Sequence, residues 1–184
     1  MLTARLFPLV VFVCCLNLSL SAQTPVTTWR NDNGRTGQNI QETQLTPGNV
    51  NSATFGKFFS YAVDGYVYAE PLYVSGLNIA GGIHNAVFIA TEHDSVYAMD
   101  ADHNRQFWTA SLVDTAHGAA AGATSVPSSD VGKSSILPEI GITSTPVIDP
   151  AAKTIYVVAK SKENGGYVER LHALDLTTGQ EQPQ

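Results

Sequence analysis

The sequence predicts an all-β protein, and three observations carry that prediction. After the first two dozen residues, short runs of β-branched and aromatic residues alternate with turn residues, which is typical of strands. No window of about a dozen residues in that part shows the apolar stripe of a helix. Marker residues also recur at a spacing of 75 residues, which indicates an internal repeat.

The N-terminus has the features of a secretory signal peptide. Arg5 precedes an apolar run from Leu6 to Leu16, and small or polar residues follow up to Ala22, an order typical of such signals. A retained membrane anchor is the alternative, but the run is short and Pro8 and Asn17 interrupt it. We therefore predict a signal peptide over residues 1–22, a secreted or periplasmic location, and no membrane span after its removal.

The composition of the mature chain excludes two classes of partner and one kind of stabilisation. Both cysteines, Cys14 and Cys15, lie inside the signal, so the mature chain has no disulfide. Removal of Arg5 leaves nine Lys and Arg against sixteen Asp and Glu. Such an acidic chain, without a basic patch, is not expected to bind nucleic acid or anionic lipid.

Two repeats of strands follow the signal. In residues 58–113 we expect strands at Tyr66–Ala69, Leu72–Val74, Ala86–Ala90 and Ser95–Met99. In residues 138–184 we expect them at Thr145–Ile148, Thr154–Ala159 and Tyr167–Leu174. The pairs 75 residues apart are Pro71 and Pro146, Ala98 and Ala173, and Asp100 and Asp175. Three strands, a polar turn and a fourth strand after the Asp suit one propeller blade.

The predicted architecture is therefore an incomplete β-propeller of about two four-stranded antiparallel blades. Residues 23–57 form a polar N-terminal segment, and residues 114–137 form a loop rich in Ala, Gly and Ser between the repeats. A loop of that length is often functional, and this one could cover the mouth of a central channel. Closed propellers have at least about four blades, so the second repeat is expected to be truncated and the natural protein longer.

The turns after Asp100 and Asp175 carry a family resemblance. The first copy matches the pattern Ala-x-Asp-x-x-Thr-Gly-Lys-x-x-Trp at Ala98, Asp100 and Trp108, with Arg105 in place of the Lys; the second matches at Ala173, Asp175, Thr178 and Gly179. This pattern resembles the tryptophan-docking motif of the PQQ-type (quinoprotein-like) β-propeller repeats, where PQQ is pyrroloquinoline quinone. The resemblance covers roughly residues 28–182.

The motif implies structural roles for its residues. The Asp side chain accepts hydrogen bonds from the tight turn that follows it, and Gly179 or Asn104 supplies a positive φ there. The ring of Trp108 is expected to lie across the adjacent blade and to bury a large apolar area.

One short segment, residues 139–146, is predicted to contact a ligand. Gly-Ile-Thr-x-Thr-Pro at residues 141–146 resembles the start of quinoprotein blades, where the innermost strand faces the central channel. By that resemblance Glu139, Thr143 and Ser144 are the candidate cofactor-binding residues. The alternative is that Thr143 is an ordinary strand residue and Gly141 a bulge or close-packing position.

No metal site and no catalytic residue are predicted. His84, His93 and His103 match no zinc spacing. The acids Glu92, Asp94, Asp130 and Glu139 match no compact calcium loop and, unless Glu139 contacts the ligand, are expected to be solvated turn carboxylates.

The predicted function is that of an exported β-propeller module, a binding or interaction scaffold with an unidentified protein or glycan partner. The alternative, implied by the resemblance, is the N-terminal part of a quinoprotein dehydrogenase that uses PQQ and Ca²⁺; the missing cysteines disfavour it. A third candidate is carbohydrate recognition through Tyr66, Tyr68 and Tyr73, although these side chains are expected to pack between blades.

Overall fold

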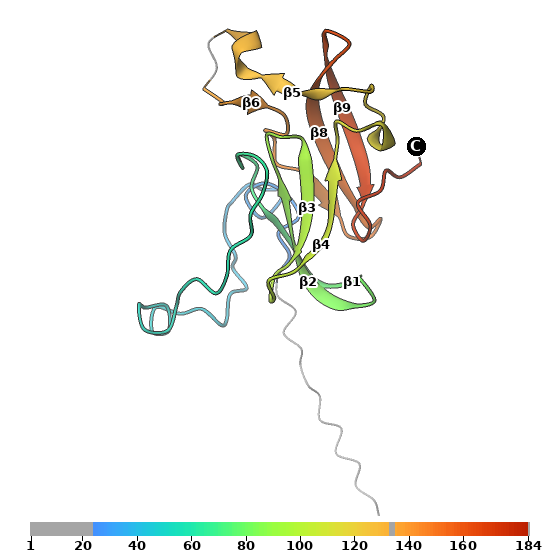
Figure 1. Cartoon of the computed structure of the whole chain (residues 1–184). Coiled ribbons are helices and arrows are strands. Elements are labelled where there is room, and N and C mark those ends of the chain that lie inside the picture. Colours follow the sequence, from blue (N-terminus) through green and yellow to red (C-terminus); the bar gives the residue numbers. More distant parts are fainter. Residues whose placement is uncertain (1–23, 133–134, 184) are drawn as a thin grey trace, which may run out of the picture.

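The computed structural model describes residues 24–132 and 135–183. The predicted signal peptide therefore lies outside the described residues. Within these ranges the chain forms two antiparallel sheets, of four and five strands, with no α-helix (Figure 1). No helix in the same ranges is long and apolar enough to span a membrane. The predicted all-β class is confirmed.

The first sheet is a simple meander. It contains β1 (Leu72–Ile79), β2 (Gly82–Ala90), β3 (Ser95–Asp100) and β4 (Gln106–Ser111), side by side in that order. Three of the predicted strands fall inside β1, β2 and β3, and β4 is the fourth strand that we expect after the Asp turn.

The prediction of a strand at Tyr66–Ala69 is wrong. This segment crosses the turn between β2 and β3 instead of running along a strand, because Glu92 N donates to Tyr66 O at 2.9 Å and Gly65 lies against His93. The free edge of β1 pairs with Val26 through an isolated bridge to Tyr73. Tyr66 and Tyr68 are 62% and 50% exposed, so the expectation that they pack between blades is also wrong.

The second sheet is built around one long strand, β8 (Thr154–Glu163). One edge of β8 pairs with β9 (Gly166–Asp175) along its whole length. Its other edge pairs first with β7 (Val147–Asp149) and then with β5 (Thr124–Pro127), and β5 in turn pairs with β6 (Glu139–Ile140). The predicted strands of the second repeat correspond to β7, β8 and β9, and a fourth position outside β9 is marked by the isolated bridge Leu174–Glu181.

The segment predicted as an Ala/Gly/Ser-rich loop is partly regular. Residues 114–137 contain β5 and two short 3₁₀ helices, η1 (Thr115–His117) and η2 (Ser128–Val131). Val126 of β5 is fully buried. This strand is stabilised by the burial of Val126 and by pairing with β8. Its four residues alone are too few to predict a strand from the sequence.

The Asp turn repeats atom for atom in the two sheets. Asp100 Oδ1 accepts from the amides of residues 102 and 103, and Asp175 Oδ1 accepts from those of residues 177 and 178. Gly179 has φ +72° as expected, but Asn104 is not among the residues with positive φ. The first turn has another support, because the Tyr61 hydroxyl donates to Asp100 O at 2.6 Å and accepts from Arg105 N at 3.1 Å.

An apolar core lies between the two sheets. Its larger buried members are Leu72, Phe88 and Trp108 from the first sheet and Ile148, Ile155, Val157 and Leu174 from the second. Trp108 contacts the second sheet directly, because its Nε1 donates to Leu176 O at 2.9 Å. A Cβ built on Gly179 would lie 2.5 Å from the Trp108 ring, so only glycine allows the ring this close. The predicted contact of Trp108 with the neighbouring sheet is confirmed.

The polar N-terminal segment joins β1 and β7, which are edge strands of the two sheets. Val26 bridges to Tyr73 of β1, and Ile148 N of β7 donates to Thr27 O at 2.8 Å. Glu70 N also donates to Thr145 Oγ1 at 2.9 Å. These bonds fix the starts of the two sheets next to each other.

Candidate functional site

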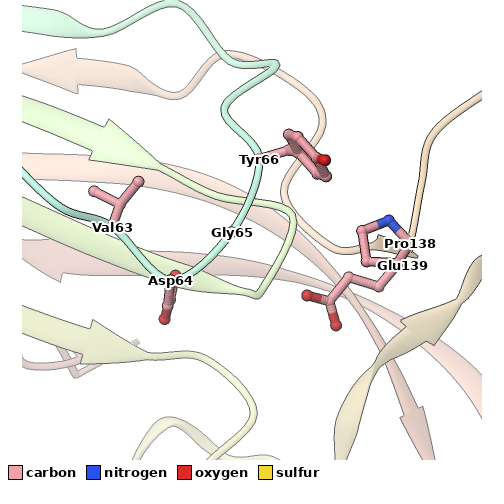
Figure 2. A pocket seen from close by; sticks show the side chains of 6 residues that line it. All are labelled: Val63, Asp64, Gly65, Tyr66, Pro138 and Glu139. Atoms are coloured by element: carbon pink, nitrogen blue, oxygen red, sulfur yellow. The ribbon is translucent and has the colours of Figure 1, made fainter.

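A cavity of about 280 Å³ opens between the segment that precedes β1 and the start of β6. Val63, Asp64, Gly65 and Tyr66 line one side, and Pro138 and Glu139 line the other (Figure 2). The two sides are more than seventy residues apart in the chain. The cavity therefore forms only when the two sheets are docked.

The predicted site residues are separated by the structure. Glu139 lines the cavity, and Figure 2 shows its carboxylate extending toward the segment of Asp64 and Gly65. Thr143 does not line it, because its hydroxyl donates to Glu92 Oε2 at 3.0 Å. Ser144 is exposed and is also absent from the lining.

Asp64 is held by the turn between β2 and β3. Thr91 Oγ1 donates to its Oδ1 at 2.9 Å, and Ser95 Oγ donates to its Oδ2 at 2.5 Å. A side chain on Gly65 would collide with His93 N at 2.9 Å, so the glycine permits the segment to approach the turn this closely. The carboxylate is thus oriented before any ligand arrives.

His93 and Glu139 form an ion pair beside the cavity. His93 Nδ1 lies 2.7 Å from Glu139 Oε1. This hydrogen bond, opposed by partial burial, raises the pKa of His93 above its ordinary value. The negative charges of Asp64 and Asp94 act in the same direction, so the pair links the turn to β6 through a charge-assisted contact.

Two carboxylates of the same turn are fully buried. Glu92 and Asp94 both have no exposed surface, so the expectation that they are solvated is wrong. Gly141 N donates to Glu92 Oε2 at 2.8 Å. Burial raises the pKa of Asp94 to about 7; Ser125 and the Lys160 amide oppose this shift, and the charges of Glu92 and Glu139 increase it.

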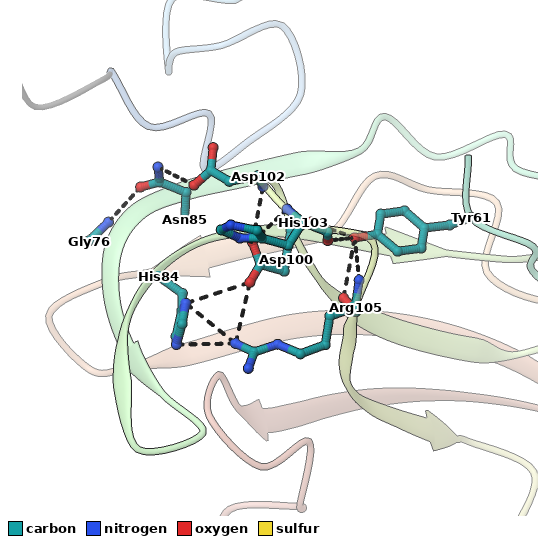
Figure 3. Close-up of polar contacts among 8 residues, drawn as sticks. All are labelled: Tyr61, Gly76, His84, Asn85, Asp100, Asp102, His103 and Arg105. Atoms are coloured by element: carbon teal, nitrogen blue, oxygen red, sulfur yellow. Dashed lines mark hydrogen bonds and ion pairs between the residues drawn. The ribbon is translucent and has the colours of Figure 1, made fainter. Parts of the chain in front are cut away.

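His84 and His103 lie at the Asp100 turn. Nδ1 of His84 and of His103 lie 3.5 Å and 3.3 Å from the Asp100 carboxylate, and Arg105 Nη2 lies 3.3 Å from it (Figure 3). Burial opposes ionisation of Asp100, but the hydrogen bonds from Asp102 and His103 keep its pKa below the ordinary value. This cluster stabilises the Asp100 turn. Among the described residues, no three His, Cys, Asp or Glu side chains form a metal-binding group.

Sequence reasoning missed the half of the cavity formed by Asp64 and Tyr66. Asp64-Gly65 is typical of a turn, and this pattern does not predict that the turn lies near residue 139. The burial of Glu92 and Asp94 has a weak signal in the sequence, because their turn joins two strongly apolar strands. Comparison with protein-family models, curated proteins and solved structures found no match for this chain.

Proposed function

We propose that the chain is an exported, propeller-like binding module, and that it binds a glycan in the cavity between residues 63–66 and the start of β6. The cavity itself carries this proposal: segments distant in sequence meet there and present two carboxylates and a tyrosine ring. Carboxylate oxygens accept hydrogen bonds from sugar hydroxyls. Tyr66, 62% exposed, offers an amphipathic ring of the kind that suits half-wet binding surfaces.

Three observations support the interpretation of the two sheets as neighbouring blades. Trp108 of the first sheet docks on the Asp turn of the second. The edge strands β1 and β7 both bond to the polar N-terminal segment, at Val26 and Thr27. The outer face of the second sheet exposes an apolar group that could receive a further sheet: Val147, Tyr156, Val158 and Leu171.

The residues at the cavity do not fit PQQ, the cofactor of the alternative dehydrogenase function. PQQ is a tricarboxylate, whereas the cavity is lined by the carboxylates of Asp64 and Glu139 and by no Lys or Arg of the described residues. The nearby base, His93, is already paired with Glu139. Like charges repel, so this cavity favours a neutral or cationic ligand over PQQ.

The proposal is tested by ligand-observed NMR on the folded full chain. The panel contains neutral oligosaccharides, cationic amines and PQQ. Glu139→Gln and Asp64→Asn alter the cavity, and Glu169→Gln is the matched control because Glu169 is exposed and pairs only with Lys160 across β8 and β9 among the described residues. We expect oligosaccharide signals that both cavity variants weaken and the control retains. Absence of oligosaccharide binding, or binding that the cavity variants leave unchanged, would contradict the proposal.

A further inference from the structure

The unpartnered buried oxygens of the described residues lie in one group of residues. Buried side-chain atoms without a hydrogen-bond partner are Glu92 Oε1, both carboxylate oxygens of Asp94, and Ser125 Oγ. An unpaired buried polar atom costs roughly 1–3 kcal/mol, and more if it is charged. Four such atoms in three residues mark a place where a bound ion or ordered water would complete the hydrogen bonding.

The three residues come from two segments that meet next to Gly141. Glu92 and Asp94 lie in the turn between β2 and β3, and Ser125 lies in β5 of the other sheet. A Cβ on Gly141 would lie 2.8 Å from Asp94 Oδ1 and 2.4 Å from the main-chain oxygen of Glu92. Ser125 is close enough to Asp94 to lower its pKa, although no hydrogen bond of normal geometry joins them.

No cation of the described chain neutralises these carboxylates. His93, in the same turn, pairs with Glu139 at 2.7 Å. Glu92 and Asp94 take part in no salt bridge among the described residues. Ionised carboxylates in such a buried position are strongly unfavourable without a counter-charge.

We propose that Glu92, Asp94 and Ser125 bind a divalent hard cation, Ca²⁺, between the two sheets. The donors are all oxygen atoms, which is the preference of Ca²⁺, and its flexible coordination at about 2.3–2.6 Å tolerates an irregular set completed by main-chain oxygens. Two carboxylates balance its charge. Mg²⁺ suits the site less, because it requires near-ideal octahedral geometry and retains several waters.

The site has a defined structural consequence. It joins the β2–β3 turn of the first sheet to β5 of the second. The same turn positions Asp64 and His93. Ca²⁺ would therefore stabilise the junction that forms the cavity. The inference does not depend on the cavity binding a glycan, and its test measures a different quantity.

The test is a calorimetric titration of CaCl₂ into the full chain after removal of metal with a chelator. It is performed at about pH 8, above the pKa of about 7 that burial gives Asp94. We expect one ion per chain and a rise in the unfolding temperature on saturation. Asp94→Asn is the main variant, since it removes a buried charge and is expected to fold, and it should weaken binding by at least about tenfold. Ser125→Ala should weaken binding less, and Glu169→Gln should leave it unchanged.

Two results overturn the proposal. One is the absence of saturable Ca²⁺ binding to folded wild-type chain. The other is binding that Asp94→Asn retains at wild-type strength, which would place the ion on the acidic surface. Circular dichroism of each variant establishes that it is folded, and Glu92→Gln provides a second, independent change if one variant fails to fold.

Discussion

Trp108 and Gly179 show how single residues couple the two sheets. The indole of Trp108 covers the α-carbon of Gly179 and donates to Leu176 O. The same glycine has φ +72°, a conformation that costs an L-residue free energy. Gly179 therefore serves both the turn and the docking of the ring, and the two roles can be separated by mutation.

We expect Gly179→Ala to lower the free energy of unfolding by more than the cost of a positive φ alone. Its added Cβ would lie 2.5 Å from the ring, and overpacking of this kind typically costs about 1–3 kcal/mol. Gly37→Ala is the matched control, because Gly37 has φ +66° and a Cβ added there would meet no described atom within 4 Å. Urea unfolding of both variants measures the difference. Equal losses would show that the contact with Trp108 contributes nothing.

Asp94 makes stability depend on pH in the metal-free chain. Its pKa rises from the ordinary 3.8 to about 7 on folding, so the folded state binds the proton more tightly than the unfolded state. The free energy of unfolding should then fall as the pH rises from about 4 to about 7 and level off above, with a total on the order of 3–4 kcal/mol. Asp94→Asn should remove this slope, whereas Glu169→Gln should keep it. A wild-type slope unchanged in Asp94→Asn would disprove the assignment to this carboxyl.

At the level of the elements, Glu163 joins three segments at the end of β8. Its carboxylate receives both guanidinium nitrogens of Arg170 from β9, the Ser161 hydroxyl at 2.6 Å, and Ala120 N at 3.0 Å from the segment before β5. The hydrogen bonds from Arg170 are the main reason that the pKa of Glu163 lies at about 2. The folded state therefore favours the ionised form.

Arg170→Gln should destabilise the chain near neutral pH by roughly 1–3 kcal/mol, because it removes charge-assisted hydrogen bonds from a buried carboxylate. Because the pKa of Glu163 is depressed on folding, this contribution is present above about 4.5 and is lost as the pH falls toward 2. Chemical unfolding of wild type and variant across this range measures the difference. A loss of stability that stays constant down to the lowest pH would contradict the assigned cause.

The long strands could be predicted from the sequence, whereas β5 and β6 could not. The apolar runs at residues 86–90 and 154–159 lie within β2 and β8, because strands this long carry their own pattern. β5 and β6 have four and two residues, and only pairing with distant chain makes them strands. Tyr66–Ala69 has strand composition but no strand partner among the described residues, so composition misled there.

The same distinction applies to the site. Glu139 was predicted because a local phrase near it resembles the start of quinoprotein blades, and it does line the cavity. Asp64, Tyr66 and the buried position of Glu92 and Asp94 follow from the docking of two sheets. That docking is a property of contacts far apart in sequence, and local residue patterns do not contain it.

At the scale of the whole molecule, the outer face of the second sheet decides how the chain associates. Val158 and Leu171 pair across β8 and β9 and are 44% and 61% exposed. Beside them, Val147 pairs with Tyr156, and both are exposed. Contiguous exposed apolar surface of this kind marks a contact surface or an aggregation site.

We expect the isolated chain to self-associate through this face with rising concentration. The double substitution Val158→Glu and Leu171→Glu should reduce association, since it places charge in the middle of the apolar group, and should leave the core between the sheets intact. Sedimentation velocity over a range of concentrations, with thermal unfolding as the control for folding, measures both effects. A wild-type chain that stays monomeric throughout would show that this face receives no partner sheet.

The cavity between residues 63–66 and Glu139 is the proposed binding site. The most direct measurement is NMR chemical-shift mapping of the chain with a bound oligosaccharide from the panel. We predict that amide shifts concentrate in residues 63–66 and in Glu139 together, the two sides of the cavity, and that they disappear in Glu139→Gln. Shifts confined to the outer face of β8 and β9, or no shifts at saturating oligosaccharide, would contradict the claim.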